Sequence, residues 1–354
     1  MVAAGRISQA VLLVGGAGTR LRPLTYLMPK ALLPVLNRPL ISYEVELLAR
    51  SGVSEVLLST GCQAGQLREA LGAGDRWGIH LTYVEEQRPL DTAGAVKNAQ
   101  ELLASEFFVF NGDLILDCDL AELARAHRQS GALVTILLRR VEDISHFGLV
   151  QRNEDGFVTA FREKAETDAT GQQTINAGVY VVAAEVLDYI PVGEPYSNET
   201  DLFPALLEAG LPIFGHLPDV QSYWTDVGRL ETYLAANRDL LSGRLPWVDW
   251  PRCDEQLEGG GVWVVPPICC GLRVKVGKAA RVGPYVTLGD DVEIGAGSVL
   301  TDCIVQAGAV VEDEVTLDSV IVAANETVPT GHNQTGGVFC TYEQRDAADD
   351  SRAD

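Results

Sequence analysis

The sequence predicts an α/β fold with a mixed, mainly parallel sheet, followed by a C-terminal left-handed parallel β-helix. Two observations lead to this prediction. Up to about residue 240, short apolar runs typical of strands alternate with amphipathic patterns typical of helices. Further along, an aliphatic residue followed by a small one recurs every six positions, which is typical of a parallel β-helix.

Six apolar runs are expected to form the strands of the sheet: Ala10–Val14, Val56–Ser59, Leu81–Glu85, Phe107–Phe110, Leu133–Leu138 and Gly178–Val182. Segments between them space apolar residues three and four apart and predict helices: Ile41–Ser51, Gln66–Leu71 and Thr92–Ala104. The runs Phe147–Val150 and Phe157–Phe161, separated by Asn153-Glu154-Asp155-Gly156, predict a hairpin laid on that sheet.

The six-residue period follows a Gly- and Pro-rich stretch and includes Val276-Gly277, Val282-Gly283, Leu288-Gly289, Ile294-Gly295 and Leu300-Thr301. We expect the aliphatic residues to stack inward and the small residues to permit tight corners. The chain is therefore divided into an α/β domain at 1–242, a linker at 243–261, a β-helix at 262–330 and a mobile acidic tail at 331–354.

Charge and cysteine content exclude several classes of protein. The chain holds 27 basic and 49 acidic side chains, a formal net charge of −22, which argues against binding to nucleic acid or to an anionic membrane. No stretch reaches the length of a membrane span, and Ala10–Val14 is too short for a signal peptide. Seven cysteines without a CxxC pair favour a reduced, cytoplasmic chain with buried thiols.

A glycine-rich loop, Gly15-Gly16-Ala17-Gly18-Thr19-Arg20-Leu21-Arg22-Pro23, follows the first strand. Its backbone amides can approach phosphate oxygens closely. It is not a Walker loop, which needs GK[ST], nor a dinucleotide fingerprint, which needs a glycine where Leu21 stands. Because Arg20, Arg22 and Lys30 accompany the glycines, the loop predicts a phosphate site rather than an ordinary turn.

The segment GGAGTRLRPLT, followed by PKALLPVLNRPLI, resembles the opening signature of the sugar-1-phosphate nucleotidyltransferases, which make nucleotide sugars. Further segments match in order: PLDTAGAV at 89–96, FNGD at 110–113, FGLV at 147–150, FREK at 161–164, NAG at 176–178 and YWTDVG at 223–228. The TAGA continuation is most similar to the mannose-1-phosphate guanylyltransferase (GDP-mannose pyrophosphorylase) branch. The resemblance implies a Rossmann-like nucleotidyltransferase domain over residues 9–240 and a catalytic protein.

The resemblance also implies roles for individual residues. The catalytic residues would be Arg20, Lys30 and Lys164. The nucleotide would contact Val14, Gly15, Gly16, Gly18, Thr19, Glu86, Asp91, Thr92, Ala93 and Gly112. The sugar phosphate would contact Gly148, Glu163, Lys164, Asn176 and Gly178. Family members often have proline after the EK pair, where this chain has Ala165.

Two aspartates are candidate ligands for Mg²⁺. Asp113 lies at the carboxyl end of a predicted strand, where open α/β sheets bind their ligands. Asp226 lies in the loop before a predicted helix. Two carboxylates together with triphosphate oxygens suit Mg²⁺, and by resemblance these two residues are the metal pair.

The choice of base depends on Glu86. Guanine presents N1–H and N2–H₂ as adjacent donors, which a carboxylate can accept side by side, whereas uracil and thymine suit a glutamine amide. In the family, the side chain that reads the base lies five residues before a glycine, and here Asp91 replaces that glycine. This register points to Glu86 and favours GTP. One alternative stays open: Glu86 is a surface residue at the end of the strand, and Gln87 reads the base in a register shifted by one residue.

The expected reaction transfers a nucleotidyl group from a triphosphate to a sugar 1-phosphate, or to a sugar-like cyclitol 1-phosphate, by direct in-line attack. Alternatives are thymidylyl, uridylyl or adenylyl transfer to glucose 1-phosphate and, in another class, a non-catalytic regulatory or binding subunit on the same fold. Only His332 lies near the coils, so we expect the β-helix to be structural rather than an acyltransferase. A homo-oligomer formed through the β-helix or the catalytic domain is also expected.

Overall fold

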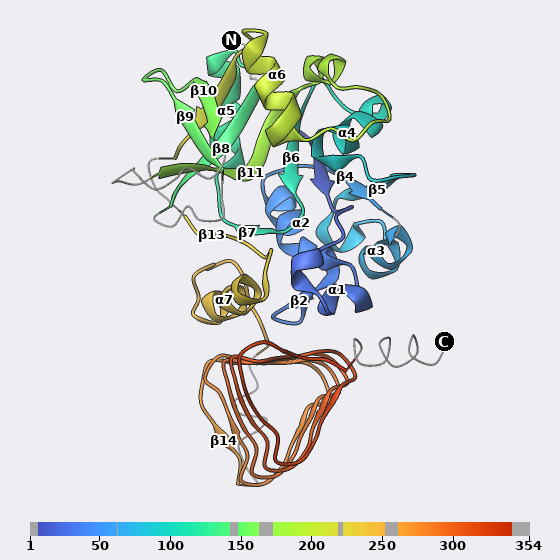
Figure 1. Cartoon of the computed structure of the whole chain (residues 1–354), viewed down its shortest axis with the longest axis vertical. Coiled ribbons are helices and arrows are strands. Elements are labelled where there is room, and N and C mark those ends of the chain that lie inside the picture. Colours follow the sequence, from blue (N-terminus) through green and yellow to red (C-terminus); the bar gives the residue numbers. More distant parts are fainter. Residues whose placement is uncertain are drawn as a thin grey trace, which may run out of the picture. The chain divides into compact units, whose positions relative to one another are not determined.

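The computed structural model describes residues 6–61, 63–141, 148–162, 173–218, 222–251 and 261–341. The chain divides into two compact units, of which the first comprises Met1–Gly16 and Ile41–Trp224 and the second Ala17–Leu40 and Thr225–Asp354. Figure 1 labels the main elements of both. The chain therefore leaves the first unit inside the glycine-rich loop, directly after Gly16.

A nine-stranded sheet forms the centre of the first unit. Its strands are β1 (Gln9–Leu13), β4 (Glu55–Thr60), β5 (His80–Glu85), β6 (Glu106–Asn111), β8 (Val134–Val141), β9 (Leu149–Arg152), β10 (Val158–Arg162), β11 (Gln173–Ala183) and β12 (Ile213–His216). They follow the order β10-β9-β11-β6-β1-β4-β5, with β8 pairing β11 and β12. The neighbours β6, β1, β4 and β5 are parallel, whereas β11 is antiparallel to β6 and β8. The predicted mixed, mainly parallel sheet is confirmed.

Helices surround this sheet (Figure 1), and each buries apolar residues. They are α2 (Ile41–Arg50), α3 (Ala64–Leu71), α4 (Asp91–Asn98), α5 (Leu120–Ser130) and α6 (Phe203–Glu208). Val11 of β1, Leu57 of β4 and Val96 of α4 belong to one buried cluster. Because β1 has a parallel neighbour on each side, its run of buried aliphatic residues is continuous rather than alternating.

The predicted hairpin is formed by β9 and β10, which pair antiparallel. At its turn, the side chain of Asn153 accepts a hydrogen bond from the backbone N–H of Phe157 (2.8 Å). The hairpin joins the sheet where Leu149 lies opposite Ile175 of β11. Two shorter strands are β7 (Leu114–Leu116) and β13 (Trp224–Asp226).

The second unit begins with the segment that carries Arg20 and Lys30. It contains two single 3₁₀ turns, Thr19–Leu21 and Lys30–Leu32, the short helix α1 (Leu24–Leu27) and a small hairpin of β2 (Pro34–Val35) and β3 (Arg38–Pro39). Helix α7 (Leu230–Leu241) lies in the same unit and buries Tyr233, Ala236, Asn237, Leu240 and Leu241.

The rest of the second unit is a coil of three parallel sheets, shown in orange and red in Figure 1. The first sheet holds β14 (Trp263–Val264), β17 (Arg281–Val282), β20 (Val299–Thr301), β23 (Thr316–Asp318) and β26 (Asn333–Thr335). The second holds β15 (Ile268–Cys270), β18 (Val286–Leu288), β21 (Ile304–Val305), β24 (Ile321–Val322) and β27 (Val338–Phe339). The third holds β16 (Lys275–Val276), β19 (Glu293–Ile294), β22 (Val310–Val311) and β25 (Thr327–Val328).

The register explains the six-residue period of the sequence. Trp263 pairs with Arg281 and Val299 with Thr316, so each coil takes 17 or 18 residues and contributes three strands. Of the aliphatic residues of the repeat, Val282, Leu288 and Leu300 are completely buried, whereas Val276 is partly buried. The expected β-helix is confirmed.

The coil extends beyond its predicted end at residue 330. Strand β26 pairs with β23, and β27 pairs with β24, so regular pairing continues to Phe339. The sequence pattern does not predict this last coil, because Gln334 stands at the position that Leu300 and Leu317 occupy in the two preceding coils. Of the predicted acidic tail, residues 342–354 lie outside the described residues.

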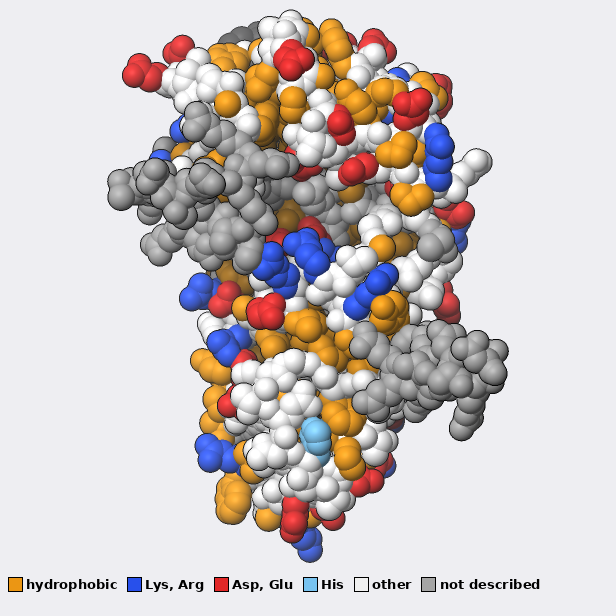
Figure 2. All heavy atoms as spheres, viewed as in Figure 1, with side chains coloured by type: hydrophobic (Ala, Val, Ile, Leu, Met, Phe, Trp, Pro, Cys, Tyr) orange, Lys and Arg blue, Asp and Glu red, His pale blue; other side chains and the backbone are white. Residues whose placement is uncertain are grey.

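Charged side chains on the outside of the coil pair with residues of the next coil. Arg273 donates to Asp291, and Lys275 donates to Glu293. On the face shown in Figure 2, basic side chains are interspersed with acidic ones. Exposed ion pairs of this kind add little to stability because solvent screens them, so the coil depends mainly on its buried aliphatic stack.

The cysteines correct one expectation. Cys118, Cys269 and Cys303 are free thiols, whereas Cys270 in β15 is disulfide-bonded, which departs from the expected set of reduced thiols. Burial raises the pKa of Cys269 and Cys303 to about 12, which keeps both as thiols at neutral pH. Within the described parts of the chain, none of the helices combines the length and apolar character needed to cross a membrane.

Candidate active site

The glycine-rich loop begins where β1 ends. The backbone N–H of Val14 donates to the carbonyl of Ser59 (2.9 Å), which ties the start of the loop to β4. A Cβ placed on Gly15 would lie 2.8 Å from Oε1 of Glu86 and 3.3 Å from the backbone nitrogen of Gly61. The backbone at Gly15 is thus packed against the Glu86 carboxylate, and the structure brings these two predicted nucleotide-binding residues together.

Two hydrogen bonds fix the Glu86 side chain. The hydroxyl of Ser59 donates to Oε1 (3.0 Å), and the backbone N–H of Leu90 donates to Oε2 (3.0 Å). Glu86 is half-buried directly after β5, whereas Gln87 is exposed. The side chain next to Gly15 is therefore that of Glu86 and not that of Gln87.

The start of α4 holds three further predicted contacts. Asp91 has a φ of 58°, a left-handed conformation that explains why glycine suits this position. The hydroxyl oxygen of Thr92 accepts the backbone N–H of Asn198 (2.7 Å), and the N–H of Ala93 donates to the carbonyl of Tyr196 (2.8 Å). These groups of Thr92 and Ala93 are thus engaged within the protein, while the Asp91 side chain is exposed.

The carboxyl end of β6 holds Gly112 and Asp113. The N–H of Gly112 donates to the carbonyl of Leu13 (3.0 Å), and a Cβ at position 112 would lie only 2.5 Å from Cγ1 of Val14. After Asp113, the N–H of Leu114 donates to Oε1 of the completely buried Glu44 (2.7 Å). The backbone on both sides of Asp113 is therefore held by hydrogen bonds, which fixes the position from which its side chain extends.

Asn176 and Gly178 lie beside the same strand end. Gly178 has a φ of 75°, and a Cβ there would lie 2.9 Å from Nδ2 of Asn111, the residue before Gly112. The N–H of Gly178 donates to Oδ1 of Asn176 (2.9 Å). The structure therefore brings the predicted sugar-binding residues Asn176 and Gly178 close to the backbone that leads into Asp113.

A polar network that sequence reasoning missed holds the Asn176 side chain. Its Nδ2 donates to the hydroxyl of Tyr180 (2.8 Å) and to Oε1 of Glu199 (3.3 Å), and the Tyr180 hydroxyl donates to the same oxygen (3.0 Å). Burial, followed by the Glu199 charge, raises the pKa of Tyr180 well above its usual value, so its hydroxyl stays protonated.

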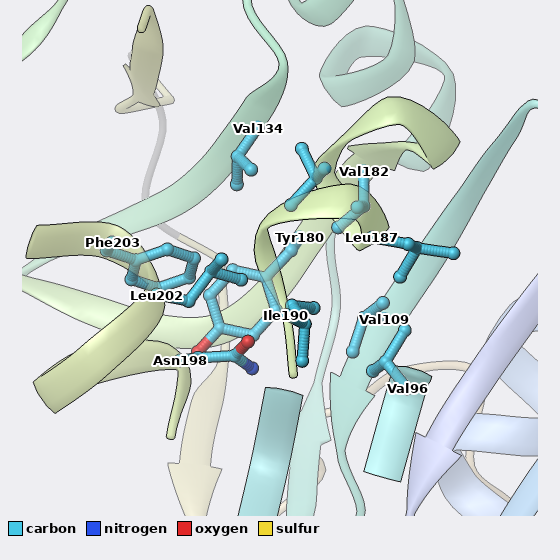
Figure 3. Close-up of a pocket in the computed structure, with 11 residues that line it drawn as sticks. Val96, Val109, Val134, Tyr180, Val182, Leu187, Ile190, Asn198, Leu202 and Phe203 are labelled. Carbon is cyan, nitrogen blue, oxygen red and sulfur yellow. The ribbon is translucent and has the colours of Figure 1, made fainter. Parts of the chain in front are cut away.

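The ring of Tyr180 lines an apolar cavity together with Val109, Leu202 and Phe203 (Figure 3). All four side chains belong to the buried cluster of the sheet, so this cavity is part of the core. The local signal for this network was Tyr180 itself, which stands among the aliphatic residues Val179, Val181 and Val182 near the end of β11.

In the second unit, Lys30 lies against the glycine-rich loop. Gly18 has a φ of 61°, and a Cβ there would lie 2.9 Å from Cγ2 of Thr25 and 3.2 Å from Cβ of Lys30. The hydroxyl of Thr25 donates to the carbonyl of Gly18 (2.9 Å). Gly18 and Lys30 are thus brought together, and Thr19 is exposed beside them.

Arg20 and Asp226 flank Gly228. A Cβ at position 228 would lie 2.8 Å from Oδ2 of Asp226 and 3.2 Å from Nη2 of Arg20. Arg22 differs from Arg20, because its guanidinium lies over the ring of Tyr26, 4.7 Å from the centroid. The cation that accompanies the predicted metal ligand is therefore Arg20.

The remaining predicted contacts are in the hairpin region. Gly148 directly precedes β9 and is exposed. Glu163 and Lys164 lie outside the described residues, so their predicted roles in binding the sugar phosphate stay predictions.

The family model described as "Nucleotidyl transferase" matches residues 9–243 of this chain. This chain belongs to the nucleotidyl transferase family. The model described as "GMPPB C-terminal domain" matches residues 264–337 of this nucleotidyltransferase, which include the last coil. The resemblance to sugar-1-phosphate nucleotidyltransferases is confirmed, and the chain is an enzyme of this class.

Curated relatives extend over both units of the nucleotidyltransferase. It is 38% identical over 307 residues to a mannose-1-phosphate guanylyltransferase of Mycobacterium tuberculosis, covering 86% of this chain and 82% of that protein. It is 30% identical over 329 residues to a UTP–glucose-1-phosphate uridylyltransferase of Synechocystis, covering 87% and 82%. The resemblance to the guanylyltransferase branch is thereby also confirmed.

Solved structures agree with the fold. HddC from Yersinia pseudotuberculosis, crystallised in complex with GMP-PN, matches this nucleotidyltransferase with a TM-score of 0.58 and 25% identity, covering 66% of this chain and all of that one. A glucose-1-phosphate thymidylyltransferase from Bacillus anthracis matches with a TM-score of 0.59 at 23% identity, covering 69% and 97%, and shows the shared fold.

Proposed function

We propose that this nucleotidyltransferase transfers a guanylyl group from GTP to mannose 1-phosphate, giving GDP-mannose and pyrophosphate. The observation that carries the choice of base is the Glu86 carboxylate, which Ser59 and Leu90 fix beside Gly15. The choice of acceptor rests on the relatives named mannose-1-phosphate guanylyltransferase, among them the Mycobacterium tuberculosis protein.

The geometry of Glu86 supports guanine in two ways. Each carboxylate oxygen accepts one hydrogen bond within the protein, and each keeps a second lone pair for a ligand. A guanine edge offers two adjacent N–H donors to these lone pairs. Uracil and thymine would instead bring carbonyl oxygens next to the carboxylate, which repels them.

We propose Mg²⁺ as the cofactor, held by Asp113 and Asp226. The donor chemistry fits, because Mg²⁺ in proteins is usually bound by one or two carboxylates together with substrate phosphates. Within the described ranges, no group of three or more His, Cys, Asp or Glu side chains could hold a metal, so oxygens of the triphosphate would complete the set. When bound, the ion would neutralise charge on the phosphates.

The residues of the protein would contribute by positioning the two substrates and by neutralising charge on their phosphates. An oxygen of the sugar phosphate attacks the α-phosphorus of the triphosphate, a new P–O bond forms, and the bond to pyrophosphate breaks. Arg20 and Lys30 would balance charge on the triphosphate, while Lys164 would hold the attacking phosphate and Asn176 a sugar hydroxyl. No general base is required, because the attacking phosphate is already ionised at neutral pH.

Release of pyrophosphate tests the proposal. The full chain is incubated with Mg²⁺ and each of five nucleoside triphosphates, crossed with mannose, glucose and galactose 1-phosphates and a cyclitol 1-phosphate. We expect release with GTP and mannose 1-phosphate to exceed every other pair. Release with UTP and glucose 1-phosphate, the pair suggested by the Synechocystis relative, would retain the enzyme class but refute the base and acceptor. If no pair of substrates released pyrophosphate, the enzyme class, the base and the acceptor would all be refuted.

The variant Glu86→Gln tests the base assignment directly. Glutamine has the same shape, its oxygen can accept the N–H of Leu90, and its amide can donate to the Ser59 hydroxyl, so the loop is expected to keep its fold. We expect kcat/KM for GTP to fall about tenfold to a hundredfold, while the values for UTP and dTTP stay within threefold or rise.

Glu85→Gln is the matched control, since Glu85 is the adjacent carboxylate and pairs with Arg68 on the surface. It removes the same charge and should leave the preference between bases unchanged. An unaltered GTP-to-UTP ratio in Glu86→Gln would show that Glu86 does not read the base.

A further inference from the structure

The small hairpin that follows Lys30 has an unusual backbone. Between β2 and β3, Leu36 and Asn37 have φ values of 45° and 61°, in the left-handed region. Leu36 is also completely buried. A bulky residue at positive φ costs conformational energy and persists only where surrounding contacts stabilise it. The hydrogen bonds of this hairpin therefore show which parts of the protein hold its backbone in place.

Helix α7 supplies the first set of contacts. The hydroxyl of Tyr233 donates to the carbonyl of Pro34 (2.6 Å), and Oδ1 of Asn237 accepts the backbone N–H of Leu36 (3.1 Å). Tyr233 and Asn237 are four residues apart and therefore share one helix face. Nδ2 of Asn237 donates to the carbonyl of Tyr233 (3.1 Å), which sets the orientation of the amide.

The β-helix supplies the second set. Nδ2 of Asn37 donates to the carbonyl of Leu288 in β18 (2.7 Å), and the Thr287 hydroxyl donates to Oδ1 of Asn237 (3.4 Å). Nε2 of Gln306 donates to the Tyr233 hydroxyl (3.5 Å). We call these six residues the hairpin clamp: Asn37, Tyr233, Asn237, Thr287, Leu288 and Gln306.

The clamped hairpin continues into the loop that carries Lys30. The N–H of Leu40 donates to the carbonyl of Leu33 (3.0 Å), and the N–H of Leu33 donates to the carbonyl of Lys30 (3.0 Å). Lys30 in turn lies against Gly18. A short series of contacts thus leads from the β-helix through the hairpin to the backbone of Lys30 and to Gly18.

We propose that the hairpin clamp makes the β-helix a support for the nucleotide site, with Asn37 and Tyr233 acting as positioning residues for Lys30. This rests on the proposed function, in which Lys30 binds the triphosphate. The clamp holds the Lys30 loop in its binding conformation before the nucleotide arrives, so that little ordering is left to occur on binding. The described residues proposed to contact the acceptor sugar, Asn176 and Gly178, lie on β11 in the first unit, so we expect acceptor binding to be independent of the clamp.

Two variants of the full chain test this inference. Asn37→Gly keeps the left-handed backbone unstrained and removes the bond to Leu288. Tyr233→Phe keeps the ring and removes the bond to Pro34. For each we expect KM for GTP to rise about two- to tenfold and KM for mannose 1-phosphate to stay within twofold. We also expect faster hydrogen–deuterium exchange in peptides covering residues 33–40.

Asn325→Gly is the control, because Asn325 also has a left-handed φ, of 60°, on the β-helix but is not a clamp residue. It should change neither KM nor exchange at 33–40. Unchanged exchange in both clamp variants, or faster exchange with KM for GTP unchanged, would overturn the inference.

Failure of the proposed function gives a different pattern. If the wild type releases no pyrophosphate with any triphosphate, the inference is judged by calorimetric binding of GTP to the same three variants. A wild type that binds GTP, with binding weakened in the clamp variants only, would uphold it. Equal binding by all variants, or no binding by the wild type, would overturn it.

Discussion

Replacing Asp113 by asparagine is expected to lower kcat about 10³-fold, which corresponds to about 4 kcal/mol of transition-state stabilisation. Asparagine has nearly the same shape, and the backbone on both sides is anchored by Gly112 and by the bond from Leu114 to Glu44. The fold should therefore persist while the negative charge proposed to bind Mg²⁺ is lost. The measurement is pyrophosphate release at saturating substrates and Mg²⁺, together with thermal unfolding.

Asp119→Asn is the matched control for this change. Asp119 caps α5 by accepting the N–H groups of Ala121 and Glu122 (2.9 and 3.0 Å), and asparagine caps helices about equally well. Its kcat and unfolding temperature should both remain close to those of the wild type. More than a tenth of normal activity in Asp113→Asn would remove this residue from the proposed metal site.

Replacing Lys30 by methionine is expected to lower kcat/KM for GTP about 10²- to 10³-fold, the usual cost of losing one group that balances charge in the transition state. Methionine keeps the length of the side chain, and the contact between Lys30 Cβ and Gly18 involves only carbon near the backbone, so the loop should keep its shape. Steady-state kinetics with each substrate varied in turn would measure the effect.

Lys278→Met, an exposed lysine at a corner of the β-helix, controls for the change in net charge. It should alter no kinetic constant by more than twofold. An equally small effect of Lys30→Met would mean that Arg20 and the metal neutralise the triphosphate without this lysine.

The sequence predicts the sheet well because its central strands are local features. Runs such as Phe107–Phe110 are apolar, short and bounded by turns, and the structure extends this one by a single residue at each end. Gly178–Val182 is an exception, because it is the last part of a longer strand, Gln173–Ala183. The last coil of the β-helix escaped prediction because Asn333–Thr335 lacks the aliphatic residues of the repeat, although its backbone pairs in the same way. Backbone hydrogen bonds between strands do not require a particular side chain, so this pairing cannot be recognised from the sequence pattern.

The sequence predicts those parts of the candidate site that are formed by residues close together in the chain. The glycines at 15, 18 and 112 stand where a Cβ would collide with neighbouring atoms, and such residues are visible in a single sequence. Glu44, Asn111 and Glu199 escaped because their contacts join distant segments; Glu44, for example, meets Leu114 seventy residues later. The disulfide at Cys270 escaped for a similar reason, since seven cysteines without a motif favoured free thiols.

The hairpin clamp also has a consequence for the order in which the protein is made. Asn37 and Leu288, which share a hydrogen bond, are 251 positions apart in the chain. At a synthesis rate of about 5–20 residues per second, Leu288 leaves the ribosome roughly 13–50 s after Asn37. During that interval the growing chain carries the left-handed hairpin and the cationic loop without their β-helix contacts, so these segments reach their final conformation only late in translation.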